Sequence, residues 1–226
     1  MHRYNIFYLV HKGLRQMLYQ TAGQLQQTDF SNADEAATLL LQMEDVLNLF
    51  DEHAATEDHF ILPAIENYEP AAATLFEEEH MQDHALGNRL RALLNMFHHA
   101  VSSDEKKEMG SAVRLAFTEF LVFNIQHMAK EEQLLNNLLW RHYTDEQLES
   151  VTGQILAHLP ANTIIKNNAW MMRALSNNEI AGWLKKVKDQ APEPVFEQLL
   201  CLAEKELPPH RWRNLQEDMT EGAMLA

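Results

Sequence analysis

Apolar residues recur at helical spacing along most of the chain, and strand-like alternation of apolar and polar residues is hard to find. The first part of the sequence divides into four long amphipathic segments, with breaks at "TDFSNADE", "YEPAA" and "SSDE". We expect helices over residues 3–27, from about 32 to 68, over 71–101, and from 102 to about 141. Because short turns make neighbouring long helices antiparallel, the pattern predicts an all-α protein with an up-down-up-down four-helix bundle.

The pattern changes after Tyr143, where prolines divide the rest of the chain into short helices. We expect a four-helix bundle domain over residues 1–142 and a helical C-terminal extension over residues 143–226. Capping boxes are expected at Ser102, Thr144 and Ser176. Pro63, near the end of the second helix, is expected to kink or loosen its last turns.

Charge and cysteine content narrow the classes of partner. The chain has 226 residues and a formal net charge of −15, so its surface repels phosphates and anionic lipid, and we expect neither a nucleic acid nor a membrane partner. Cys201 is the only cysteine, which excludes an intramolecular disulfide and a cysteine-rich metal site. No apolar run approaches membrane length, and a cytoplasmic location is expected by default.

Histidine and acidic residues pair at a spacing of four residues, which places both side chains on one helical face. With 12 histidines and 33 acidic residues, some pairs of this kind are expected by chance. Height along the bundle is the stronger test. In an antiparallel bundle, residues near the start of the first and third helices lie at the same level as residues near the end of the second and fourth helices. That level is some 25–30 Å from the first turn at about 1.5 Å rise per residue. Seven side chains meet the test: His11, His53, Glu57, His80, His84, His127 and Glu131.

A buried layer of imidazoles and carboxylates needs a compensating charge, which a metal ion supplies. Imidazole and carboxylate ligands without thiolate suit Fe, Mn or Zn. Two six-coordinate ions offer about twelve positions. Five histidines, two bridging carboxylates and one bridging oxygen leave about one position open, as expected for a small-ligand site.

We weigh other interpretations of the residues in and around this layer against a metal site of five histidines and two glutamates. A ferritin-like site needs Glu-x-x-His on two helices, whereas Glu77 and His80 form the only such match here. Gly87 lies one turn beyond His84, where it would allow either a close approach of helices or space beside the metals. The apolar neighbours of the layer are also ordinary core residues of a helical bundle.

Four parts of the sequence carry a resemblance to a known family: His11 and the stretches "HAATE", "HMQDH" and "HMAKEE". Together they resemble the hemerythrin-like, or HHE cation-binding, family, and the chain is similar to a bacterial member with a C-terminal helical extension. The resemblance implies a non-heme pair of Fe ions with an oxo or hydroxo bridge, with Zn or Mn as alternatives in the purified protein. The five histidines would be terminal ligands, and Glu57 and Glu131 would bridge. Hemerythrins proper place an Asp five residues after the last histidine, where this chain has Glu132. Many bacterial relatives use the fourth position, so Glu131 is the expected ligand.

The resemblance implies a protein that binds dioxygen or nitric oxide at one open iron position, for sensing, storage or redox response. Two alternatives stay open. One is a di-iron oxidoreductase that acts on peroxide or nitric oxide, or that supplies iron for the repair of iron centres. The other is a metal-dependent regulatory or structural bundle. No catalytic residue is assigned, and the C-terminal helices are expected to cover the bundle or to form the face of a homodimer.

Overall fold

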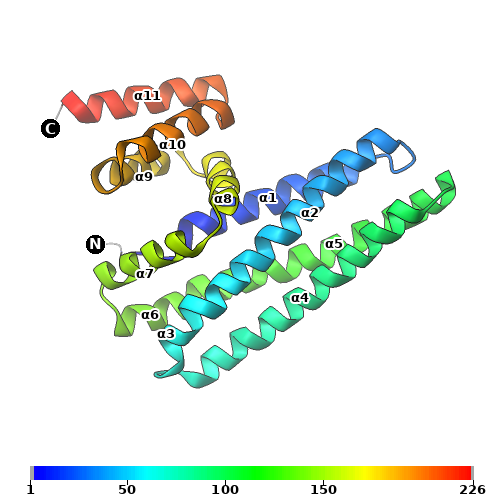
Figure 1. Cartoon of the computed structure of the whole chain (residues 1–226), viewed down its shortest axis with the longest axis horizontal. Coiled ribbons are helices and arrows are strands. Elements are labelled where there is room, and N and C mark those ends of the chain that lie inside the picture. The colour runs from blue at the N-terminus through cyan, green and yellow to red at the C-terminus, as the bar shows by residue number, and fades with distance from the viewer. Residues whose placement is uncertain (1–2, 225–226) are drawn as a thin grey trace. The chain divides into compact units, whose positions relative to one another are not determined.

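All regular structure in the described part of the chain is helical. The computed structural model describes residues 3–224, with side chains described for residues 3–220 (Figure 1). The prediction of an all-α protein is therefore confirmed for this range. The longest helices are α1 (Tyr8–Gln27), α2 (Ala33–Thr56), α4 (Pro70–His99) and α5 (Ser103–Lys130).

The chain forms two compact units. One contains Met1–Tyr8 and Met17–Leu159, and the other contains Leu9–Gln16 and Pro160–Ala226. The sequence-based division at residue 142 stays a prediction, while the first unit continues to Leu159.

In the first unit, polar caps fix where the long helices begin. The Asn32 side chain accepts hydrogen bonds from the backbone N–H groups of Asp34 and Glu35 at the start of α2. Ser102 forms the predicted capping box with Glu105 at the start of α5. These caps satisfy donors that have no partner within the helix, and so the polar breaks in the sequence become the ends of helices.

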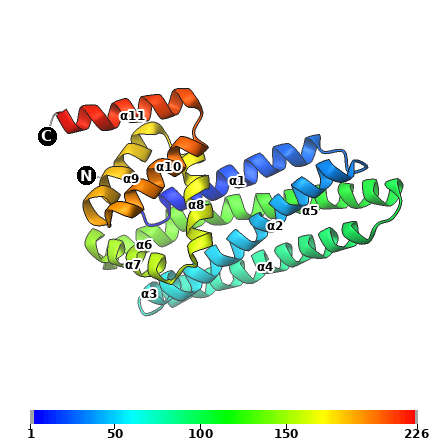
Figure 2. The same cartoon turned by 45° about the horizontal axis from the view of Figure 1, so that its top comes forward.

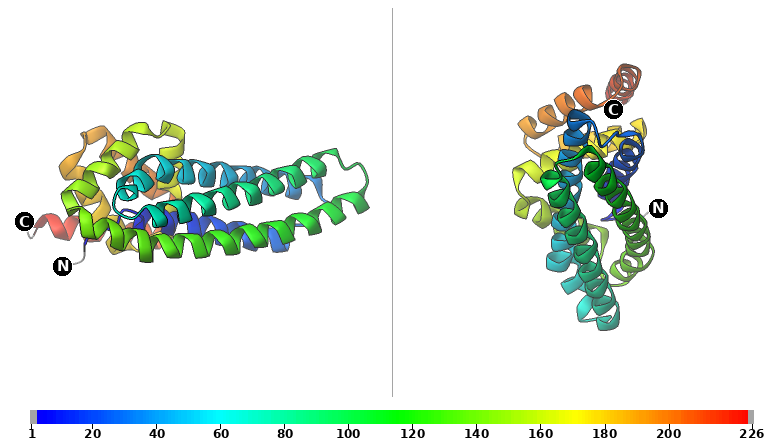
Figure 3. Two further views of the ribbon diagram at one scale, coloured as in Figure 1. Left: turned by 90° about the horizontal axis from the view of Figure 1, so that it is seen from below. Right: turned by 90° about the vertical axis from the view of Figure 1, so that its right-hand side faces the viewer.

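Helices α4 and α5 lie side by side and are joined by a short loop (Figure 3). Gly110 of α5 faces the ring of Phe30, and a Cβ added at Gly110 would overlap with that ring. Arg114 Nε and Nη2 donate hydrogen bonds to the carbonyl oxygens of Leu25 and Thr28 at 3.1 and 2.9 Å. The end of α1 and the loop after it are thereby held against α5.

Helices α2 and α5 each continue into a five-residue π-helical turn and then into a short helix. The first turn is η1 (Glu57–Ile61), followed by α3 (Leu62–Glu66); the second is η2 (Glu131–Leu135), followed by α6 (Asn136–His142). In η1 the next backbone N–H, that of Leu62, bonds to the carbonyl of Glu57. Pro63 follows directly and has no N–H to donate, so the predicted disturbance near Pro63 coincides with a π-turn, although η2 forms the same turn without a proline.

Helix α7 (Asp145–His158) completes the first unit. It begins at the predicted capping box of Thr144 and Gln147. Arg3 Nε lies 2.5 Å from Oδ1 of Asp145, and the hydroxyls of Tyr4 and Thr152 are 2.9 Å apart. These bonds tie α7 to the residues before α1.

The second unit consists of residues 9–16 and helices α8 (Ala161–Ala174), α9 (Asn177–Gln190), α10 (Glu193–Glu206) and α11 (Pro209–Met224) (Figure 2). Ser176 forms the predicted capping box with Glu179. The Glu179 carboxylate also accepts a hydrogen bond from Lys12 Nζ at 2.8 Å. Trp183 and Trp212 pack against an apolar core that includes Met172. No helix among the described residues is long and apolar enough to cross a membrane.

Candidate metal centre

Two carboxylates stand at the centre of a buried polar cluster, and each is the first residue of a π-turn. Glu57 begins η1 and is 2% exposed, and Glu131 begins η2 and is 0% exposed. π-turns inside α-helices are frequent at functional sites. The neighbouring carboxylate, Glu132, is half-buried, so the structure brings Glu131 rather than Glu132 into the cluster.

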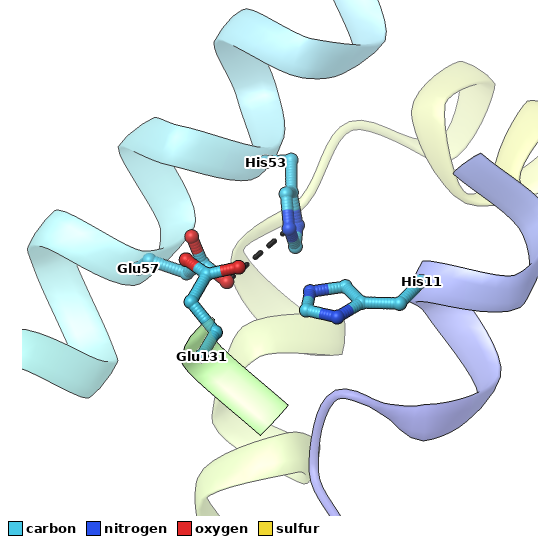
Figure 4. Close-up of side chains that lie close together, drawn as sticks. All are labelled: His11, His53, Glu57 and Glu131. Atoms are coloured by element: carbon cyan, nitrogen blue, oxygen red, sulfur yellow. Dashed lines mark ion pairs between the residues drawn. The ribbon is translucent and has the colours of Figure 1, made fainter. Parts of the chain in front are cut away.

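The potential ligand atoms form two overlapping groups. One group contains His11, His53, Glu57 and Glu131, and the other contains Glu57, His80, His127 and Glu131; in each, one ligand atom per residue lies within 4.8 Å of the others. Figure 4 shows the first group, with His53 and His11 pointing toward the two carboxylates. Because Glu57 and Glu131 belong to both groups, the arrangement suits two cations that share these carboxylates.

The imidazoles turn their Nε2 atoms toward the carboxylates. His53 Nε2 lies 3.2 Å from Oε1 of Glu57, and His80 Nε2 lies 3.3 Å from Oε2 of the same residue. His127 Nε2 lies 2.9 Å from Oε1 of Glu131. These nitrogen and oxygen atoms could all bind one pair of ions.

The opposite ring nitrogens of His80 and His127 are held by other carboxylates. His80 Nδ1 lies 2.6 Å from Oδ1 of Asp58, and His127 Nδ1 lies 2.8 Å from Oε2 of Glu79, which also pairs with Lys130. Ionised carboxylates only accept hydrogen bonds, so the Nδ1 atoms are the donors. Such bonds fix the tautomer that leaves Nε2 available to a metal ion. Sequence reasoning did not assign Asp58 or Glu79, although each directly adjoins a proposed ligand.

The same contacts set the protonation of the two imidazoles in the metal-free protein. Burial lowers the pKa of His80, but hydrogen bonds to Asp58, Glu131 and Glu57 outweigh burial and raise this pKa to about 12. For His127, burial again lowers the pKa, while Glu131 and Glu79 raise it to about 9. Without metal, protonated imidazoles therefore neutralise the buried carboxylates, and a metal ion must displace those protons.

The structure does not bring His84 into either group. Its side chain is 44% exposed, and its Nδ1 lies 3.2 Å from Oδ1 of Asp51. The buried residue on this turn is Asp83, whose Oδ1 accepts a hydrogen bond from Asn124 Nδ2 at 2.6 Å. Burial raises the pKa of Asp83. Sequence reasoning did not single out the Asp83–Asn124 pair.

The donor set fits a pair of borderline or hard transition-metal ions. Imidazole nitrogens and carboxylate oxygens suit Fe, Mn or Zn. The buried Nε2 atom of His80 lies 3.3 Å from Oε2 of Glu57 and 3.8 Å from Oε1 of Glu131, a position that suits an atom that serves as a ligand. The geometry thus fits a dinuclear cation site better than an ordinary surface ion-pair cluster.

The family of the chain agrees with this geometry. A family model described as the hemerythrin HHE cation binding domain matches residues 2–139. Since the match covers more than half of the chain, the protein belongs to the hemerythrin HHE cation-binding family.

Curated relatives include F-box/LRR-repeat protein 5 from three animals. The protein of Mus musculus is 22% identical over 180 residues, which cover 76% of this chain and 24% of that protein. The corresponding values are 21% over 179 residues for Bos taurus, covering 76% and 24%, and 22% over 183 residues for Xenopus tropicalis, covering 78% and 25%. The chain spans about a quarter of the length of these relatives. No solved structure matches the chain significantly.

Proposed function

We propose that the chain is a non-heme di-iron protein that binds a small diatomic ligand, dioxygen or nitric oxide, for sensing, storage or a redox response. One observation carries the proposal: the two groups of buried ligand atoms overlap on Glu57 and Glu131. We further propose that α1, α2, α4 and α5 act as an antiparallel up-down-up-down bundle whose inner side chains hold this centre.

The proposed roles follow from the contacts of each side chain. His11 and His53 would hold one ion, His80 and His127 would hold the other, and Glu57 and Glu131 would bridge. When bound, the iron pair supplies electrons and open positions for a small ligand. Four imidazoles and two bridging carboxylates fill about eight of roughly twelve positions of two six-coordinate ions. Because His84 contacts Asp51 and lies outside both groups, six protein ligands remain instead of the seven predicted from the sequence. The pair of ions would therefore have more open positions for external ligands.

The surroundings of His127 favour a water-poor site. The rings of Phe76 and Phe123 lie with their centroids 5.8 Å from the His127 ring. A buried apolar cluster that includes Phe7, Ile61 and Phe76 lies next to the ligand positions. Exclusion of water strengthens electrostatic contacts and limits side reactions.

Metal analysis combined with optical spectroscopy tests the proposal. Purified protein reconstituted with ferrous iron under anaerobic conditions should hold two ions per chain, and its spectrum should change on addition of dioxygen or nitric oxide. Replacing Glu57 by Gln should abolish the second ion, whereas replacing the exposed Glu78 by Gln should not. Two bound irons without any spectral response would refute ligand binding. Turnover of peroxide or nitric oxide above free-iron controls would instead favour the oxidoreductase.

A further inference from the structure

Asn136, the first residue of α6, carries a buried amide. Its side chain is 0% exposed, and neither its Oδ1 nor its Nδ2 makes a hydrogen bond within the described part of the chain. Buried amides in folded proteins are almost always hydrogen-bonded, and an unpaired one calls for an explanation such as a bound ligand.

The π-turn places Asn136 one helical turn beyond Glu131. The backbone N–H of Asn136 bonds to the carbonyl oxygen of Glu131, which closes η2. In η1 the equivalent residue after Glu57 is Leu62, whose N–H closes that turn in the same way. The two turns therefore match, except that one presents an amide where the other presents an isobutyl group.

On the side of the ligands that carries α6, buried apolar residues one turn from ligand positions pack in a cluster that includes Phe7, Ile61, Leu62, Phe76 and Leu135. The equivalent residue of η1, Leu62, belongs to this cluster, and replacing an unpaired buried amide with an apolar group of similar size removes the cost of burying the amide. Folding alone therefore gives no reason for an amide at this position.

We propose that the Asn136 carboxamide belongs to the ligand-binding site, where its N–H donates a hydrogen bond to the oxygen atom of a small ligand held by the centre. This inference rests on the proposed function and deepens it, because it assigns a specificity-determining residue on the chain itself. A donor at this position favours ligands that carry a partly negative oxygen over purely apolar gases.

The test compares Asn136→Leu with the wild-type protein, using nitric oxide as the probe for the ferrous protein. We expect the variant to bind two irons, to keep or raise its denaturation midpoint without metal, and to release nitric oxide about 3- to 10-fold faster. Asn137→Leu makes the same change at the exposed neighbouring position and should leave the release rate unchanged.

The outcomes separate this inference from the proposed function. A wild-type protein that holds two irons and binds no nitric oxide would sink the proposed function. If the wild type binds nitric oxide and Asn136→Leu releases it at the wild-type rate, only the role of Asn136 is refuted. A variant that loses stability or does not fold also overturns the inference, because the amide would then have a structural partner. Asn136→Ala, assayed in the same way, should show the same faster release.

Discussion

Asp58 and Glu79, which accept hydrogen bonds from the Nδ1 atoms of His80 and His127, should both strengthen metal binding. We expect the two carboxylates to contribute unequally to the affinity for metal. In Asp58→Asn and Glu79→Gln the amide can still accept the Nδ1 hydrogen bond, so each change removes mainly the charge. Hydrogen bonds that involve a charged group contribute about 1.5–3 kcal/mol and neutral ones about 0.5–1.5 kcal/mol. The difference, roughly 1–1.5 kcal/mol, corresponds to about a tenfold loss of affinity.

Exposure to solvent decides which variant loses more. The Asp58 side chain is 44% exposed, so solvent screening should reduce its loss to about 2- to 5-fold. Glu79 is only 12% exposed, and its replacement also leaves Lys130 with an unopposed positive charge close to the site. We therefore expect Glu79→Gln to lose about tenfold or more.

Competition with a chromophoric chelator, with Zn²⁺ as the probe ion, measures these affinities. Glu78→Gln changes an exposed carboxylate on the same helix and serves as the control. Affinities of both variants equal to that of the control would show that the Nδ1 carboxylates do not support binding. A larger loss in Asp58→Asn than in Glu79→Gln would show that the screening argument is wrong.

Four further predictions concern helix packing, the identity of a metal ligand and the dependence of stability on pH. Gly110→Ala should destabilise the protein by about 1–3 kcal/mol in urea denaturation because its Cβ overlaps an aromatic ring. Gly87→Ala, whose Cβ would meet ordinary contacts at 3.6 Å or more, should gain up to about 1 kcal/mol. Metal content measured by mass spectrometry should fall below two ions in Glu131→Gln and stay at two in Glu132→Gln. In the metal-free protein the raised pKa of His127 adds stability that is fully present below its ordinary value of 6.5 and is lost as pH rises through about 9; the metal-loaded protein should not show this loss in denaturation curves.

The sequence was sufficient to predict the all-α class and the polar caps because these depend on local patterns. Ser102, Thr144 and Ser176 are each followed after three residues by a matching acidic or amide side chain. The extent of the first unit depends on packing between distant segments. The bonds that join Arg3 to Asp145 and Tyr4 to Thr152 have no signature in either segment alone.

The height of each candidate along its predicted helix was enough to find the six side chains that come together in the structure. Height alone could not decide which of two neighbouring residues on the same helix face points inward. Asp83 and His84 follow His80 by three and four residues, and both spacings lie within one face at about 100° per residue. The structure buries Asp83 and turns His84 toward Asp51. Periodicity carries no information on this choice, which depends on the partners that α2 and α5 present.

The paired π-turns place one extra residue directly after each shared carboxylate, because the N–H groups of Leu62 and Asn136 reach back five residues to Glu57 and Glu131. Deleting one residue from η1 would let the same N–H make an ordinary α-helical bond, so the residues from Leu62 onward would keep their orientation. The extra residue is therefore a local feature of the backbone at the shared carboxylate and does not change how the following helix packs.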